Sequence, residues 1–188
     1  MHNASSSKDL YIPALGRFRI DYDILWEGRV SLPGVGKVYG TLVSPPGKQP
    51  SAYTIKTLEL FLKKWNAATY LPMIYQFFWQ EWLKNKEAFL QRIRKANESA
   101  REILGRRARQ RRIPRIQSFE DLRKVVRVCG LTVPIKARCP GDRKRTAGRY
   151  VLIEINASWE EEHIYSLFFD NGKFVKQRLS FQGGFDED

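Results

Sequence analysis

The chain has 188 residues, of which 43% are hydrophobic and 13% aromatic, enough apolar material for the core of one compact domain. It has no apolar run long enough to span a membrane and no secretory leader at its start, so we expect a soluble, cytoplasmic protein without a membrane role. Its only cysteines, Cys129 and Cys139, belong to no metal-binding grouping, which argues against a structural zinc site and a disulfide framework.

The formal net charge of +13 comes from two segments of the chain. Residues 92–115 contain ten Lys or Arg and two Glu, and residues 136–149 contain six Lys or Arg and one Asp. Their net charges, +8 and +5, account for the whole excess, so the rest of the chain is formally neutral. The charge is therefore regional, and such segments either bind a partner or form a solvated, partly flexible insertion that keeps the protein soluble.

The first part of the chain predicts an antiparallel meander that follows a polar tail at residues 1–14. Alternating apolar residues predict strands at 17–21, 24–32 and 37–43, and Gly28 lies just inside the second of them. A Pro-Gly-Val-Gly sequence supplies the turn between the second and third strands.

A segment with three prolines, residues 44–51, ends this pattern, after which Ser51 or Thr54 can cap a helix. Apolar residues at helical spacing then predict two amphipathic helices between Thr54 and Ile93. We expect Pro72 in the first turn of the second helix, and we interpret the dense aromatics there as a buried core face. The residues predicted to face the core are Ile55, Leu58, Leu62 and Trp65 in the first helix and Ile74, Phe78, Trp82, Phe89 and Ile93 in the second.

The second helix can continue through basic residues to Leu104, where Gly105 interrupts it. Residues 97–115 are therefore expected to be either helical or flexible. Beyond them, Ser118 followed by Asp121 three residues later predicts the N-cap of a short further helix.

The last part of the chain predicts more strands. Alternating β-branched residues indicate strands within 127–139 and 149–157. Asn171-Gly172 predicts a type I′ turn, and therefore a hairpin that pairs Phe168 with Val175. In this register Ile164 and Phe168 point inward, whereas the other face is aromatic and basic and carries His163, Tyr165, Phe169 and Arg178.

Together these elements predict a single α+β domain over residues 15–181. In this fold an antiparallel sheet, formed by the N- and C-terminal strands, packs against two or three central amphipathic helices. Residues 182–188 are expected to form a C-terminal tail.

Glu162 and His163 are the only neighbouring acid and histidine in a position suited to catalysis. Adjacent residues of a strand point to opposite faces, so these two side chains cannot reach one substrate atom without a bulge. No second histidine lies nearby, and no phosphate-binding loop, dinucleotide fingerprint or zinc-protease motif occurs. We therefore predict that residues 160–163 begin a strand of a non-catalytic protein without a cofactor or metal site. An enzyme that uses Glu162 and His163 is the third hypothesis.

The basic segments are the predicted binding surface. An acidic protein partner is favoured, because no nucleic-acid-binding motif accompanies the charge. A nucleic-acid-binding module is the alternative, since clustered arginines also neutralise phosphates. The oligomeric state is left open. The predicted partner-binding residues are Arg106, Arg107, Arg109, Arg111, Arg112, Arg115, Arg143, Lys144 and Arg145.

Three separated stretches carry a further pattern: WEGRVSLPGVGKVYGTL, RRIPRIQSFEDLRKVVRVCGLTVPI and ASWEEEHIYSLFFDNGKFV. In them the chain resembles a bacterial family of small domains of unknown function that is associated with proposed immunity proteins of polymorphic toxin systems. The residues that carry the resemblance are Trp26, Gly28, Trp159, Glu162, His163, Asn171 and Gly172.

This resemblance would cover most of residues 15–180 and implies an α+β domain with a partner-binding role, inferred from that association alone. The chain departs from the family pattern at Ile164, where the family tends to have glycine. The Arg-rich residues 106–115 are also unusual for the family, and this suggests a feature particular to this protein.

Overall fold

The structure is a computed structural model that describes residues 9–135, 149–170 and 172–181, and in 161–163 and 174–181 it describes the backbone alone. The turn residue Asn171 and residues 136–148, which make up nearly all of the second basic segment, lie outside the described residues.

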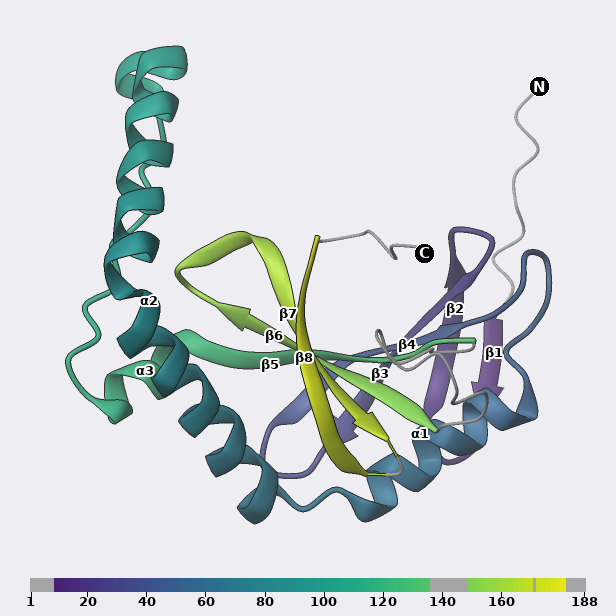
Figure 1. Ribbon diagram of the computed structural model, residues 1–188. Coiled ribbons are helices and arrows are strands. Elements are labelled where there is room, and N and C mark those ends of the chain that lie inside the picture. Colours follow the sequence, from purple (N-terminus) through teal and green to yellow (C-terminus); the bar gives the residue numbers. More distant parts are fainter. Residues whose placement is uncertain (1–8, 136–148, 171, 182–188) are drawn as a thin grey trace, which may run out of the picture. The chain divides into compact units, whose positions relative to one another are not determined.

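The described residues form eight strands and three α-helices, which confirms the predicted α+β class (Figure 1). The strands are β1 (Asp9–Ile12), β2 (Gly16–Asp21), β3 (Leu25–Leu32), β4 (Gly36–Val43), β5 (Val126–Val133), β6 (Tyr150–Ala157), β7 (Glu160–Asp170) and β8 (Lys173–Phe181). The helices are α1 (Ala52–Lys64), α2 (Ala67–Leu104) and α3 (Phe119–Val125), and a single 3₁₀ turn, η1 (Gly105–Arg107), follows α2.

The strands lie in the sheet in the order in which they occur in the sequence. Strands β1 to β4 pair antiparallel, as the meander predicts, but β4 and β5 pair parallel, with Thr41 opposite Thr132. A parallel pair needs a long crossover connection, and here that connection contains all three helices. The predicted antiparallel sheet is thus corrected at this junction, which local sequence patterns could not predict.

Strand β1 lies within the segment that the sequence analysis assigned to a polar tail. Asp9 pairs with Arg19 in the antiparallel register of β1 and β2, and its carboxylate forms ion pairs with both Arg17 and Arg19. Ile12, at the other end of the strand, is buried. The tail prediction is therefore wrong for residues 9–12, because cross-strand ion pairs and one buried side chain hold this short segment on the sheet.

The chain divides into two compact units. Of the described residues, the sheet unit comprises 9–67, 128–135, 149–155, 165–170 and 172–179, and the helical unit comprises 68–127, 156–164 and 180–181. Aromatic rings pack against one another within each unit, for example Phe61 against Phe169 in the sheet unit and Trp82 against Trp159 in the helical unit.

Helix α1 begins where the sequence analysis expected. The Ser51 hydroxyl accepts a hydrogen bond from the N–H of the third helical residue (3.1 Å) and so caps the helix. Leu58 and Phe61 are buried, whereas the predicted core residues Ile55 and Leu62 are only half-buried. The buried stripe is displaced because Phe61, three residues after Leu58, supplies the larger apolar side chain.

Helix α2 extends from Ala67 to Leu104, and its end before Gly105 confirms the prediction. Its start is earlier than expected, so Pro72 lies beyond the first turn, where it removes one helical N–H donor. No helix in the described ranges is long and apolar enough to cross a membrane. All five predicted core residues of this helix are buried: Ile74, Phe78, Trp82, Phe89 and Ile93.

Strand β7 ends at Asp170 and the neighbouring strand β8 begins at Lys173, which agrees with the predicted position of the hairpin turn, although Asn171 itself lies outside the described residues. Gly172 has φ 83°, the positive value that such a turn needs. The prediction that only the face of Ile164 and Phe168 points inward is wrong, because Tyr165 and Phe169 on the aromatic and basic face are as buried as Phe168. This part of β7 is covered on both faces of the sheet, so alternation does not distinguish an inner from an outer side.

Trp159 is the centre of an aromatic cluster in the helical unit. Its ring centroid lies 5.2 Å from that of Trp82, 5.7 Å from that of Phe89 and 6.2 Å from that of Phe78. The indole is 4% exposed. The aromatics of α2 therefore form a core around the loop that precedes β7, in agreement with the core interpretation.

Replacing Trp159 by Ala should lower the free energy of unfolding by about 3–5 kcal/mol, because it leaves a cavity among three aromatic rings. Leu83→Ala, an exposed position of the same helix, is the matched control and should change stability by less than about 0.5 kcal/mol. Denaturant unfolding followed by tryptophan fluorescence and circular dichroism measures both variants. Equal effects of the two substitutions would contradict a core role for Trp159.

Candidate functional site

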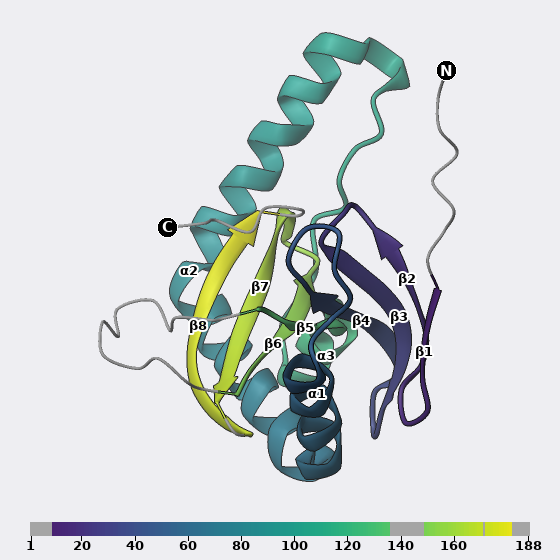
Figure 2. The same ribbon diagram turned by 90° about the vertical axis from the view of Figure 1, so that its right-hand side faces the viewer.

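The C-terminal half of α2 and the chain that returns from it form a basic arm, which we define as residues 92–115. Figure 1 and Figure 2 show the returning chain running beside the helix. Asn97 joins the two: its Nδ2 donates to the carbonyl of Arg111 (2.9 Å), and its Oδ1 accepts the N–H of Arg111 (2.6 Å). One asparagine side chain thus satisfies both backbone groups of a residue with no regular secondary structure. Of residues 97–115, which the sequence left open between helical and flexible, those up to Arg107 are helical and residues 108–115 have no regular secondary structure.

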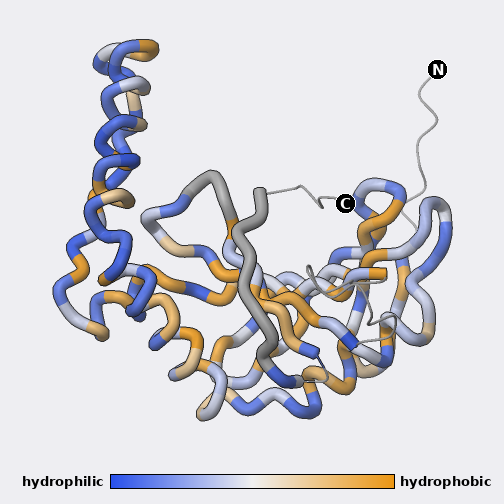
Figure 3. The backbone as a smooth tube through the Cα atoms, viewed as in Figure 1, coloured by the Kyte–Doolittle hydropathy of each residue, from blue (hydrophilic) through white to orange (hydrophobic). Residues whose placement is uncertain are grey.

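The guanidinium-bearing residues of the arm are mostly exposed. Of the predicted partner-binding residues in the arm, Arg111 is half-buried, and the others, Arg106, Arg107, Arg109, Arg112 and Arg115, are exposed. The arm also exposes large aliphatic side chains. Ile103 is 80% exposed, Leu104 59% and Ile113 43%. Figure 3 shows a mostly hydrophilic arm with hydrophobic positions at its far end.

Arg92, the first residue of the arm, contacts both a glutamate and an aromatic ring of the helical unit. Its Nη1 lies 3.0 Å from Oε2 of Glu160, whose side chain is 8% exposed, and its guanidinium lies over the ring of Phe89 at 5.0 Å. Glu160 is the first residue of β7, which confirms that residues 160–163 begin a strand. This part of the acidic Glu160–His163 sequence therefore neutralises an arginine of the arm.

Several predicted site residues lie outside what the structure describes. Arg143, Lys144 and Arg145 belong to residues 136–148, and of Glu162 and His163 the backbone alone is described. The interpretation of Glu162 and His163 as a catalytic pair therefore stays an untested hypothesis. Among the described residues, no group of three or more His, Cys, Asp or Glu side chains is placed to hold a metal ion.

The early-strand residues Trp26 and Gly28 are closely packed within the sheet unit. The indole N–H of Trp26 donates to the hydroxyl of Ser44 (3.2 Å), and the ring is 1% exposed. A Cβ atom at Gly28 would lie 2.7 Å from the carbonyl oxygen of Arg17 and 3.0 Å from the ring of Phe18. Gly28 is therefore required by close packing of the neighbouring strand.

The sheet unit also contains a row of polar side chains that the sequence analysis missed. Arg19 lies opposite Glu27, Glu27 opposite Thr41, and Thr41 opposite Thr132, so the row crosses β2, β3, β4 and β5. The hydroxyl of Thr132 donates to the carboxyl of Glu154 on β6, which extends the row to a fifth strand. We call these five residues the polar row.

The surroundings of the two carboxyl groups in the polar row, those of Glu27 and Glu154, disfavour the charged form. Burial is the main cause that raises the pKa of Glu154 above its ordinary 4.5. Burial also raises the pKa of Glu27, and repulsion from Asp21 and Glu154 adds to it. Gly130 provides space for Glu154, since a Cβ there would lie 2.5 Å from its Oε2. Burial in this region of the sheet therefore makes ionisation of both carboxyl groups less favourable than in water.

Beside the row lies an open hollow of about 490 Å³ on strands β2, β3 and β4. The guanidinium of Arg29 lies 3.6 Å from the ring centroid of Tyr39 at this hollow. Glu154 is the one charged residue in the strand sequence YVLIEINA, and this was the signal in the sequence that could have marked the polar row. The residues that line the hollow are Arg17, Arg19, Asp21, Glu27, Gly28, Arg29 and Tyr39.

The chain belongs to the family described as Domain of unknown function (DUF6985), whose model matches residues 66–184. Trp159, Glu162, His163, Asn171 and Gly172 lie within this match, whereas Trp26 and Gly28 precede it. The family description names no immunity protein and no toxin. Searches of curated proteins and of solved structures found no match to the chain.

Asn97→Ala should loosen the basic arm, because it removes the two hydrogen bonds between the Asn97 side chain and the backbone of Arg111. We expect trypsin cleavage within residues 106–115 and hydrogen exchange of the Arg111 amide to accelerate about tenfold. Asn85→Ala is the control, since Asn85 donates to the carbonyl of Glu81 within the same helix. Unchanged cleavage of the Asn97 variant would show that the arm is held by other contacts.

Glu154→Gln should change how stability depends on pH. A carboxyl group whose pKa is raised by folding stabilises the protein fully below its unfolded pKa, near 4.5, and loses this effect as the pH rises through the folded pKa. The variant should therefore gain stability over the wild type as the pH increases from 4 to 7. Denaturant unfolding across this range measures the difference, with exposed Glu87→Gln as the control. A difference that does not vary with pH would contradict burial of the charge.

Proposed function

We propose that this protein is a non-catalytic binding protein whose basic arm contacts an acidic surface of a partner protein. The observation that best supports this proposal is that the arm combines exposed arginines with exposed aliphatic side chains at Ile103, Leu104 and Ile113. Arginine is enriched at protein interfaces and in their energetic hot spots, and apolar side chains supply the desolvated centre of such contacts.

The composition of the arm supports a protein partner over a nucleic acid. Surfaces that bind single strands stack bases on aromatic rings, whereas the exposed large apolar residues in the described part of the arm are aliphatic. The net charge of +8 over residues 92–115 would also attract nucleic acid without sequence preference. Nucleic-acid binding is therefore the outcome against which the proposal is tested.

The kind of partner is suggested by the resemblance to the family associated with proposed immunity proteins. An immunity protein neutralises a toxin by covering the surface that the toxin needs. A basic arm suits an acidic toxin surface, because charge complementarity accelerates encounter and a small apolar centre slows dissociation. We propose this role in the cytoplasm, where such a complex would form.

The experiment begins with the wild-type protein and the variant Arg106→Glu/Arg107→Glu as baits for proteins from the source cells. Each protein retained by the wild type alone is purified, and association is measured with purified components at two salt concentrations. The arm variant should associate roughly tenfold or more slowly, and the difference should shrink at high salt. Lys84→Glu/Lys86→Glu, on helix α2 before the arm, changes the net charge equally and should have little effect.

A second variant separates the apolar contribution. Ile103→Ser/Leu104→Ser should increase the dissociation rate about tenfold while leaving the association rate nearly unchanged, because buried apolar area acts after encounter. Leu83→Ser is the matched control on the same helix. Retention of DNA or RNA, with affinity that falls log-linearly with salt and no protein complex, would overturn the proposal in favour of a nucleic-acid-binding module.

A further inference from the structure

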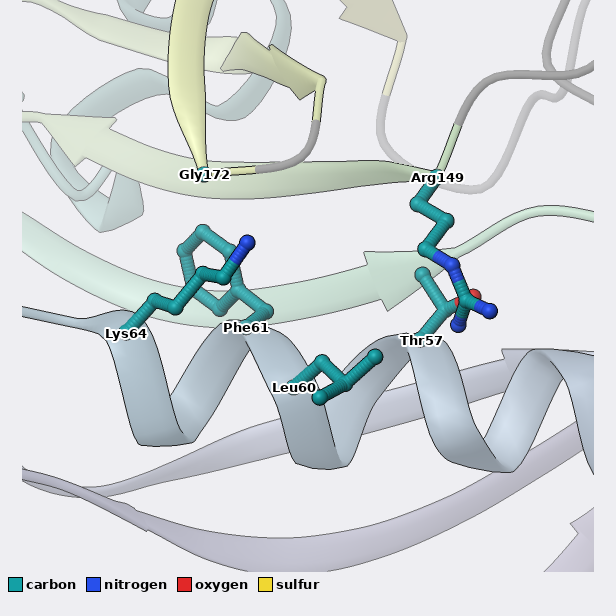
Figure 4. A pocket seen from close by; sticks show the side chains of 6 residues that line it. All are labelled: Thr57, Leu60, Phe61, Lys64, Arg149 and Gly172. Carbon is teal, nitrogen blue, oxygen red and sulfur yellow. The ribbon is translucent and has the colours of Figure 1, made fainter.

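The sheet unit contains a second hollow, which encloses about 190 Å³ above helix α1. This volume corresponds to roughly six water molecules at their share of liquid volume, so it suits only a small ligand. Among the described residues, its lining contains two cationic side chains and no carboxylate (Figure 4). The residues that line it are Thr57, Leu60, Phe61, Lys64, Arg149 and Gly172.

Arg149 is held at one end of this pocket. Its guanidinium lies 4.9 Å from the ring centroid of Tyr53, and Figure 4 shows it ending beside Thr57. Its Nη1 is buried and has no hydrogen-bond partner among the described residues. A buried donor of a charged group is costly to leave unpaired, and a carboxylate is the acceptor that a guanidinium binds best.

Lys64 lies at the other end. It is seven residues after Thr57 on α1, a separation of about 10 Å along the helix at its ordinary rise. Figure 4 shows Leu60 between the two cations and the Phe61 ring overlapping the Lys64 side chain in this view. Phe61 is 4% exposed and packs against Trp65 and Phe169, which makes this part of the wall a fixed apolar surface.

We propose that this pocket binds a small dicarboxylate with a short methylene chain. One carboxylate pairs with Arg149, the second pairs with Lys64, and the chain lies over Leu60 and Phe61. Two positive ends separated by an apolar wall match a ligand with two negative ends and an apolar middle. This site is independent of the basic arm, because all of its residues belong to the sheet unit.

Calorimetric titration and ¹⁵N NMR of the full chain with glutarate test the proposal, and butyrate provides one carboxylate on a similar apolar chain. Glutarate should bind about tenfold more tightly than butyrate, because it adds a second charge-assisted contact. Its addition should shift the Gly172 amide signal and the Nε signal of Arg149. Equal affinity for the two acids, or no binding of glutarate at millimolar concentration, would overturn the proposal.

Two substitutions assign the ends of the ligand. Lys64→Gln should reduce glutarate affinity to that of butyrate, whereas Arg149→Gln should weaken both ligands about tenfold. Lys63→Gln, the exposed neighbour on α1, and Arg29→Gln, whose guanidinium stacks on Tyr39 outside the pocket, are the matched controls and should leave binding unchanged. If the controls weaken binding as much as the pocket variants, the effect is general electrostatics and the site is disproved. The Lys64 comparison decides the result even if the Arg149 variant fails to fold.

Discussion

The parallel pairing of β4 with β5 is the constraint on which the rest of the topology depends. Strands that run in the same direction cannot be joined by a tight turn, so the chain must travel the length of the sheet before it pairs again. In this protein that crossover is residues 44–125, and it contains every described helix. The same pairing places Thr41 beside Thr132 and thereby connects the N-terminal meander to the strands that follow the helices.

The charge of the protein has two distinct physical settings. In the basic arm, most arginines are exposed, so water and salt screen their electrostatic interactions within the protein. Their charge can therefore act mainly on a partner. In the sheet unit, the carboxyl groups of Glu27 and Glu154 are partly removed from water, and their ionisation opposes folding. The exposed charge of the arm suits long-range electrostatic attraction of a partner. The second setting makes the polar row sensitive to proton concentration.

A single polar side chain shapes the arm. Residues 108–117 have no regular secondary structure, and the Asn97 amide supplies both the donor and the acceptor that the backbone of Arg111 needs. Because this contact is made by a side chain of α2, it joins the returning chain to the helix at Arg111.

Local sequence determined much of the secondary structure. Ser51 and Ser118 cap helices, Gly105 follows the end of α2, and Asn171-Gly172 marks the hairpin turn. These signals act between residues a few positions apart, so the sequence alone carries them. The five buried residues of α2 were likewise predictable, because one face of a helix repeats with a fixed period. Alternation did not predict which face of β7 is buried, because both faces of residues 165–169 are covered.

The sequence by itself therefore determined the α+β class, most helix boundaries, the aromatic core face of α2 and the segments in which positive charge collects. Only the tertiary structure decided the parallel pairing of β4 with β5 and the polar row. It also decided the hydrogen bonds between Asn97 and Arg111 and the pocket lined by Lys64 and Arg149. Each of these joins residues far apart in the chain. Their proximity follows from strand register and the return path of the backbone, which no local pattern of residue types specifies.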